Sequence, residues 1–95
     1  MEQGFIAAWE DARKKAEQLG IRMRPLAEKD AMTQAHRILS GHRESDGFFA
    51  LADKDRLDLS LEALAVQKPF TGLFSDEEAN NALTRLLDAG YRFRS

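Results

Sequence analysis

The chain has 95 residues, of which 43% are hydrophobic and 32% are charged, and it has no cysteine and a formal net charge of −2. This length fits one domain, and the absence of cysteine excludes a disulfide-stabilised scaffold, a thiolate zinc site and a cysteine nucleophile. The slightly negative charge argues against a protein that coats nucleic acid, because such domains are usually basic overall. We therefore expect residues 1–95 to form a single domain that folds through its own hydrophobic core.

The clearest predicted helix follows Gly4 and ends before Gly20. Its hydrophobic residues recur every three or four positions, and they are Phe5, Trp9, Ala12, Ala16 and Leu19. This spacing places them on one face of a helix. Glycine is favoured just after the last turn of a helix, where the chain takes a left-handed conformation. The pattern therefore predicts both the helix and its end.

A second predicted helix begins with Pro25 and runs to Ser40, directly before Gly41. Proline is favoured at the first helical position, because the N–H that it lacks has no partner there in any case. The predicted inner face of this helix consists of Ala27, Ala31, Ala35, Ile38 and Leu39.

The last predicted helix follows Ser75 and ends before Gly90. Ser75 and Glu78 have the spacing of a capping box, in which each side chain accepts a hydrogen bond from the other residue's backbone N–H. Phe74 and Ala79 occupy the two positions of a hydrophobic staple across the same boundary. Together these local signals predict where the helix begins.

Residues 47–67 allow two interpretations. Leu57, Leu59 and Leu61 alternate with polar residues, which is typical of a strand and would pair with residues 48–52 in a hairpin. The segment is also rich in Ala, Leu, Glu and Gln, which favour helices, and it lacks Thr, Ile and Tyr. We favour two short helices. The predicted fold class is mainly α, a single compact domain of about five helices, with an α+β fold as the alternative if residues 47–61 form a hairpin.

Two segments repeat the order glycine, apolar residue, arginine, apolar residue, arginine, at residues 20–24 and 90–94. If both are extended, they could pair as a small two-stranded sheet with the arginines on one face. Guanidinium groups gathered in this way bind phosphate or carboxylate groups. The alternative is that the arginines only protect a strand edge from aggregation. The predicted anion-binding or partner-binding residues are Arg22, Arg24, Arg92 and Arg94.

A second predicted surface is apolar and consists of Phe70 and Phe74. Both lie in a short segment that also contains Pro69 and Gly72. Large exposed apolar side chains usually mark an interface with another protein. The alternative is that Phe70 fills the base of the core, and Phe74 serves the hydrophobic staple.

The sequence contains no recognisable catalytic or cofactor-binding motif. His36 and His42 are the two histidines, and their spacing across a predicted helix end does not place two metal ligands on one face. Residues 53–64 begin like a calcium loop but lack the donors and the glycine that an EF-hand needs at its fifth, sixth and twelfth positions. We therefore expect no catalytic residue, no cofactor and no metal, and a protein that is not an enzyme.

Residues 61–93 have the general helix, connection and helix order of a winged helix-turn-helix. The predicted connection of about eight residues is longer than the three or four of that motif. The would-be recognition helix also begins with Asp76, Glu77 and Glu78, which would repel the phosphates of DNA. Binding of nucleic acid through such a domain is therefore the alternative and not the preferred function.

The preferred interpretation is a small non-enzymatic accessory or regulatory protein that acts by binding another protein. The alternative is a nucleic-acid-binding regulator that uses the arginine patch in a helix-turn-helix-like domain. The N-terminus lacks the cationic region of a secretory signal, and no apolar run approaches the roughly 20 residues of a membrane span. We therefore expect a cytoplasmic location and no membrane partner. A homodimer through the stripe that contains Trp9 is also compatible with the pattern.

Overall fold

The computed structural model describes residues 2–23, 30–68 and 70–91, which form five α-helices, two short 3-10 helices and no strand. The helices are α1 (Glu2–Gln18), α2 (Ala31–Ser40), α3 (Phe48–Asp53), η1 (Leu57–Leu59), α4 (Leu61–Ala65), η2 (Thr71–Leu73) and α5 (Asp76–Asp88). The predicted mainly α fold is therefore confirmed. No helix in this part of the chain combines the length and the apolar character that crossing a membrane requires.

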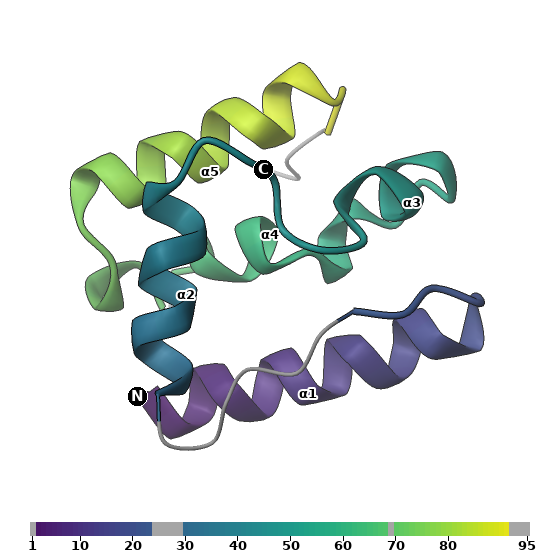
Figure 1. Ribbon diagram of the computed structural model, residues 1–95, viewed down its shortest axis with the longest axis horizontal. Helices are drawn as coiled ribbons and strands as arrows, with labels where there is room; N and C mark the ends of the chain where they lie inside the picture. The colour runs from purple at the N-terminus through teal and green to yellow at the C-terminus, as the bar shows by residue number, and fades with distance from the viewer. Residues whose placement is uncertain (1, 24–29, 69, 92–95) are drawn as a thin grey trace.

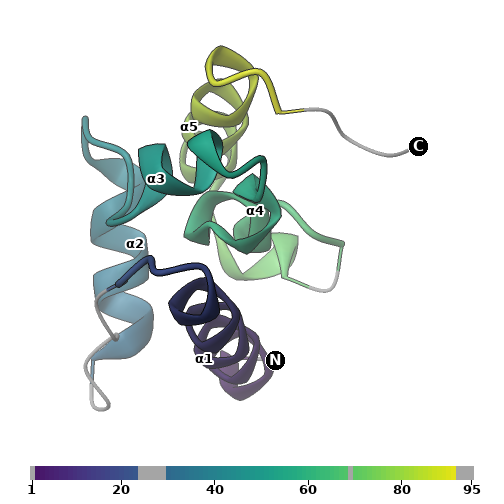
Figure 2. The same cartoon turned by 90° about the vertical axis from the view of Figure 1, so that its right-hand side faces the viewer.

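The short helix α4 lies at the centre of the molecule. Figures 1 and 2 both show it between α1 on one side and α5 on the other, with α2 crossing beside them. All of its residues are buried. Ser60 caps its first turn by accepting a hydrogen bond from the backbone N–H of Ala63 at 3.1 Å. Because so short a helix is not stable alone, its packing against the longer helices must hold it in place.

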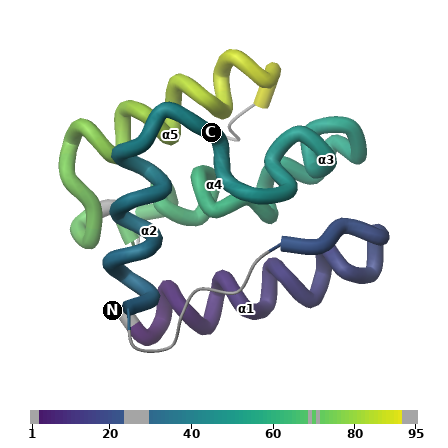
Figure 3. The backbone as a smooth tube through the Cα atoms, in the orientation of Figure 1, coloured from purple at the N-terminus to yellow at the C-terminus, as the bar shows by residue number. Residues whose placement is uncertain are grey.

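The core forms around α4, and α1, α2, α3 and α5 each contribute to it. The largest fully buried hydrophobic side chains are Phe5, Leu39, Phe48, Leu51, Leu61 and Leu86. The chain then reaches α3 from α2 through residues 41–47, whose path runs close to α4 and α5 in the tube of Figure 3. This connection positions the site described below.

Three helices end in the same backbone motif. After α1, Gly20 has a φ of +82°, and the N–H of Ile21 donates to the carbonyl of Ala16 at 2.9 Å. The same motif closes α5 at Gly90, so both predicted glycine ends are confirmed. It also closes α3 at Asp55, which has a φ of +57° although it is not a glycine. The structure also confirms the capping box at the start of α5.

The middle segment forms helices, so the hairpin alternative for residues 47–61 is wrong. Leu57 and Leu59 lie in η1, and both are buried together with Leu61 in α4. The 3-10 helix is followed by the extended residue Ser60, with φ −73° and ψ 156°, before α4 begins. This change of backbone conformation directs three alternating leucines into one core, and so it produces the spacing of a strand without forming one.

Other predicted elements differ in extent. α2 begins at Ala31 with Asp30 as its N-cap, and the predicted start at Pro25 lies outside the described residues. The short segment that contains Phe70 and Phe74 includes the 3-10 helix η2. Residues 21–23 and Tyr91 form no strand, and residues 24 and 92–94 of the predicted strand pair lie outside the described residues.

Candidate functional site

The predicted arginine patch is described at one of its four positions. Arg22 is exposed, in the segment that follows α1. Arg24, Arg92 and Arg94 lie outside the described residues. Whether the four arginines share a surface therefore stays a prediction.

The two phenylalanines of the predicted apolar surface pack in the core. Phe70 and Phe74 are only 9% and 8% exposed. Each makes an edge-to-face contact with Phe5 of α1, at centroid distances of 5.4 and 5.1 Å. This is where the alternative interpretation places Phe70. The described chain shows no face of this pair that a partner could reach, and a role in an interface stays a prediction.

A buried ionic network lies beneath the connection between α2 and α3. Glu62 of α4 is completely buried (0% exposed), and its Oε2 lies 3.2 Å from Nη1 of Arg85 in α5. The same carboxylate accepts two hydrogen bonds from Ser45, from the backbone N–H at 2.8 Å and from the hydroxyl at 2.5 Å. Three segments far apart in the sequence therefore meet at one carboxylate.

Arg85 also binds the C-terminal end of α2. Its Nη1 donates to the carbonyl of Ile38 at 3.2 Å, and its Nη2 donates to the carbonyl of Gly41 at 2.7 Å. Asn81, one turn earlier on α5, donates to the carbonyl of Leu39 at 2.9 Å. The last carbonyls of a helix have no partner within the helix, so α5 supplies side chains that satisfy them.

The cost of burying charge indicates what this network does. Transferring two ions from water to the protein interior costs several kcal/mol for each ion. Replacing a buried ion pair by well-packed hydrophobic residues often leaves the stability unchanged or raises it by about 1–4 kcal/mol. Hydrophobic side chains, however, cannot form hydrogen bonds with the backbone N–H and C=O groups of a loop. Glu62 binds Ser45 and Arg85 binds Gly41, so the connection between α2 and α3 is held at its first residue and again four residues later. The network therefore fixes the position of this loop.

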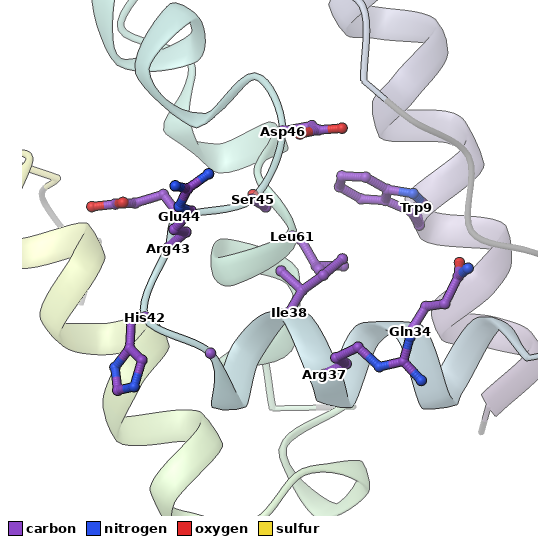
Figure 4. Close-up of a pocket in the computed structure, with 11 residues that line it drawn as sticks. Trp9, Gln34, Arg37, Ile38, His42, Arg43, Glu44, Ser45, Asp46 and Leu61 are labelled. Carbon is purple, nitrogen blue, oxygen red and sulfur yellow. The ribbon is translucent and has the colours of Figure 1, made fainter.

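The fixed loop forms one wall of a pocket. This wall consists of residues 41–46, which we call the 41–46 loop. Together with α1, α2 and α4, the loop encloses a pocket of about 480 Å³. Figure 4 shows the side chains around it. They are Trp9, Gln34, Arg37, Ile38, His42, Arg43, Glu44, Ser45, Asp46 and Leu61, with Gly41 also lining the space. The volume lies within the roughly 300–1,000 Å³ of typical ligand sites.

The floor of the pocket is apolar. Ile38 and Leu61 lie at its centre in Figure 4, and the indole of Trp9 lies beside them. Trp9 is buried, and its Nε1–H has no hydrogen-bond partner within the described part of the chain. A buried unpaired N–H costs roughly 1–3 kcal/mol, and the large ring must offset this cost through its apolar contacts.

Charged side chains surround this floor. Arg37 at the end of α2 and Arg43 in the 41–46 loop are both exposed, and among the described residues neither guanidinium has an ion pair. Glu44 extends away from the centre of the pocket in Figure 4. Asp46 lies on the side of Trp9 and already interacts with another group. Two guanidinium groups and the carboxylate of Glu44 therefore lie around the pocket without an ion pair among the described residues.

His36 lies elsewhere, in a pair with Glu78. Its Nδ1 is 2.8 and 2.9 Å from the two carboxylate oxygens, and its ring packs on Phe74 at 5.1 Å. Burial would raise the pKa of Glu78, but hydrogen bonds from the backbone of Ser75 and from His36 favour the charged form and hold the pKa below its ordinary value. His42 lies at the pocket, and the described chain contains no group of three residues suited to a metal ion.

A second hollow of about 1,040 Å³ lies between the end of α3, η1, α4 and the end of α5. Its lining includes Arg56 and Asp58, which pair with each other at 3.1 Å. Because these two charges neutralise each other, the hollow has less unpaired charge than the pocket beside Trp9. We assign no function to it.

Sequence reasoning did not single out Arg37, Arg43, Glu62 or Arg85. One signal was present, since Glu62 is the only charged residue in the apolar run of residues 59–66. A charge in such a run predicts a buried partner, but not which one. Comparison of the chain with protein-family models, with curated proteins and with solved structures gave no significant match.

Proposed function

We propose that this protein is a small non-enzymatic accessory or regulatory protein that binds another protein through the pocket beside Trp9. One observation carries the proposal: the 41–46 loop, which forms a wall of the pocket, is bound from within by Glu62 and Arg85. A cytoplasmic location belongs to the same proposal and rests on the sequence alone.

A fixed loop favours binding for a physical reason. Ordering a loop on association costs free energy, and a loop that is already ordered avoids this cost. Binding residues also need support from other side chains if they are to keep their geometry. The ionic network supports the loop that carries Arg43 and Ser45, and α2 presents Arg37 on a regular helix.

The test compares three forms of the protein in affinity capture from the native host. The double variant Arg37→Glu with Arg43→Glu reverses both guanidinium charges at the pocket. The control, Lys14→Glu with Lys54→Glu, makes the same change in net charge at two exposed positions that line neither cavity. We expect a protein that the wild type and the control retain and that the pocket variant retains at least about tenfold less. Equal retention by all three forms would contradict the proposal.

Binding of nucleic acid through the arginine patch is the competing proposal, and salt distinguishes it. If the four arginines contact four phosphates, the affinity should fall roughly 150-fold when the salt concentration rises from 50 to 200 mM. Each contact contributes about −0.9 to the slope of log affinity against log salt concentration. Arg22→Glu with Arg92→Glu would abolish such binding. Recovery of nucleic acid with this salt dependence, and of no protein, would favour the alternative.

A further inference from the structure

Three residues on one face of α5 bind α2 and the start of the 41–46 loop. Glu78, Asn81 and Arg85 follow each other at spacings of three and four residues, which places them along one side of a helix. Asn81 and Arg85 donate hydrogen bonds to carbonyl groups at the end of α2 and at the first residue of the loop. An amide is neutral and a guanidinium is always charged, so neither of these contacts varies with pH. The third contact joins Glu78 to His36, and histidine is the side chain that ordinarily changes charge near neutral pH.

The geometry of this pair allows the imidazole to gain a proton without breaking the contact. Nδ1 of His36 lies 2.8 and 2.9 Å from the two oxygens of Glu78. A charged carboxylate only accepts hydrogen bonds, so Nδ1 is the donor and Nε2 is the nitrogen that takes up the second proton. Nε2 has no partner among the described residues, and the side chain is 40% exposed, so water reaches the ring. Protonation therefore adds a positive charge beside the carboxylate and makes the contact an ion pair.

The surroundings of the pair favour a strong attraction between the two charges. The side chain of Glu78 is only 9% exposed, and the ring of His36 packs on Phe74 at a centroid distance of 5.1 Å. Both features reduce the screening by water. Among the described residues, Glu78 is the charged group that interacts with His36, and His36 is the one that interacts with Glu78. The remaining donor to the carboxylate is the backbone N–H of Ser75 at 2.8 Å, which does not titrate.

We propose that the His36–Glu78 pair is a pH-sensitive contact that binds α2 and the 41–46 loop more firmly to α5 when His36 is protonated. The stabilisation is present at mildly acidic pH, and it is lost as the pH rises through the range in which histidine ordinarily loses its proton. It is lost again in stronger acid, when the carboxylate of Glu78 gains a proton. The inference concerns the free protein and does not rest on the proposed function.

Hydrogen exchange at the backbone amide of Ser45 tests the inference, because this N–H is buried in the loop and donates to Glu62. The readout is the protection factor, which corrects for the intrinsic effect of pH on exchange. We expect the protection factor of the wild type to fall about threefold when the pH rises from 6 to 8, on the scale of a partly exposed ion pair. An unchanged protection factor would overturn the inference.

Three variants assign the pH dependence to the pair. His36→Gln keeps a hydrogen-bond donor but cannot gain a charge, so it should abolish the fall in protection. Glu78→Gln keeps an acceptor for the N–H of Ser75 but removes the negative charge, so it should abolish the fall as well. His42→Gln changes the other histidine of the chain and should keep the fall. A fall that persists in His36→Gln or in Glu78→Gln, or that disappears in His42→Gln alone, would overturn the inference.

Discussion

Nη1 of Arg85 lies 3.2 Å from Oε2 of Glu62, and both side chains are almost completely removed from solvent. The two residues are 23 positions apart and come from the central helix and the last helix. Each also binds the chain between α2 and α3, Glu62 at Ser45 and Arg85 at Gly41. The ion pair therefore connects the interior of the protein to the loop that lines its pocket.

Removing one partner of this pair should be costly. Arg85→Met leaves the carboxylate of Glu62 buried without a counter-charge, and we expect a loss of about 3–5 kcal/mol in the free energy of unfolding. Adding Glu62→Gln should recover part of this loss, because a neutral amide needs no counter-charge. Urea unfolding measures both effects.

The exposed pair Lys15–Asp11, at 3.2 Å, provides the control. Lys15→Met should cost less than about 1 kcal/mol, since exposed ion pairs contribute little. A similar cost for Lys15→Met and Arg85→Met would show that burial of the pair has no special role.

The carboxylate of Glu78 should make stability depend on pH in the acidic range. Its pKa is lower in the folded protein than its ordinary value, so the unfolded chain binds more protons between the two pKa values. The stabilisation is therefore present above the unfolded pKa, about 4.3, and is lost as the pH falls through the folded pKa.

Glu78→Gln should lower stability at neutral pH and flatten this part of the pH profile of unfolding free energy. Glu77→Gln makes the same charge change in the same turn and serves as the control. A profile for Glu78→Gln with the same acidic slope as that of the wild type would contradict the role assigned to Glu78.

Glycine substitutions should separate backbone strain from steric fit. Gly20 has a φ of +82°, and an added Cβ would meet no atom within 4 Å, so Gly20→Ala tests the backbone alone. We expect a loss of about 1–2 kcal/mol, the cost of a left-handed L-residue. Gly72 has equally open space without the positive φ, and Gly72→Ala should be neutral or stabilising by up to about 1 kcal/mol. Equal effects of the two substitutions in thermal unfolding would contradict this explanation.

Replacing a buried and an exposed phenylalanine should change the free energy of unfolding by different amounts. Phe70 is buried against Phe5, and Phe70→Ala should destabilise the protein by about 3 kcal/mol or more. Phe49 is 63% exposed, and Phe49→Ala should change the free energy of unfolding by less than about 0.5 kcal/mol. A small cost for Phe70→Ala would return Phe70 to the surface role that the sequence first suggested.

The accuracy of the sequence predictions follows the range of the interactions involved. The helix ends at Gly20 and Gly90 and the capping box at Ser75 depend on residues within a few positions, so they could be predicted. The alternating leucines gave rise to the incorrect hairpin alternative, because a 3-10 helix followed by an extended residue produces the same period as a strand. Local spacing therefore predicts helix boundaries better than it distinguishes short elements.

The pocket could not be predicted in this way. Ser45, Glu62 and Arg85 are 17 and 23 positions apart and meet only after three elements have packed. The three residues form no sequence motif. In the sequence alone, Arg85 cannot be distinguished from an exposed residue of an amphipathic helix, because its contacts come from other helices. Tertiary packing, and not a local pattern, creates the site.

The buried side chains of Glu62 and Arg85 hold the 41–46 loop in place, and hydrogen exchange at one amide tests this role most directly. The backbone N–H of Ser45 donates to the buried carboxylate of Glu62 at 2.8 Å. We expect it to exchange as slowly as the amides of α4, and to lose this protection in the Arg85→Met variant under conditions where that variant is folded. Exchange of the Ser45 amide in the wild type as fast as that of an unprotected loop amide would show that the buried network does not hold the loop.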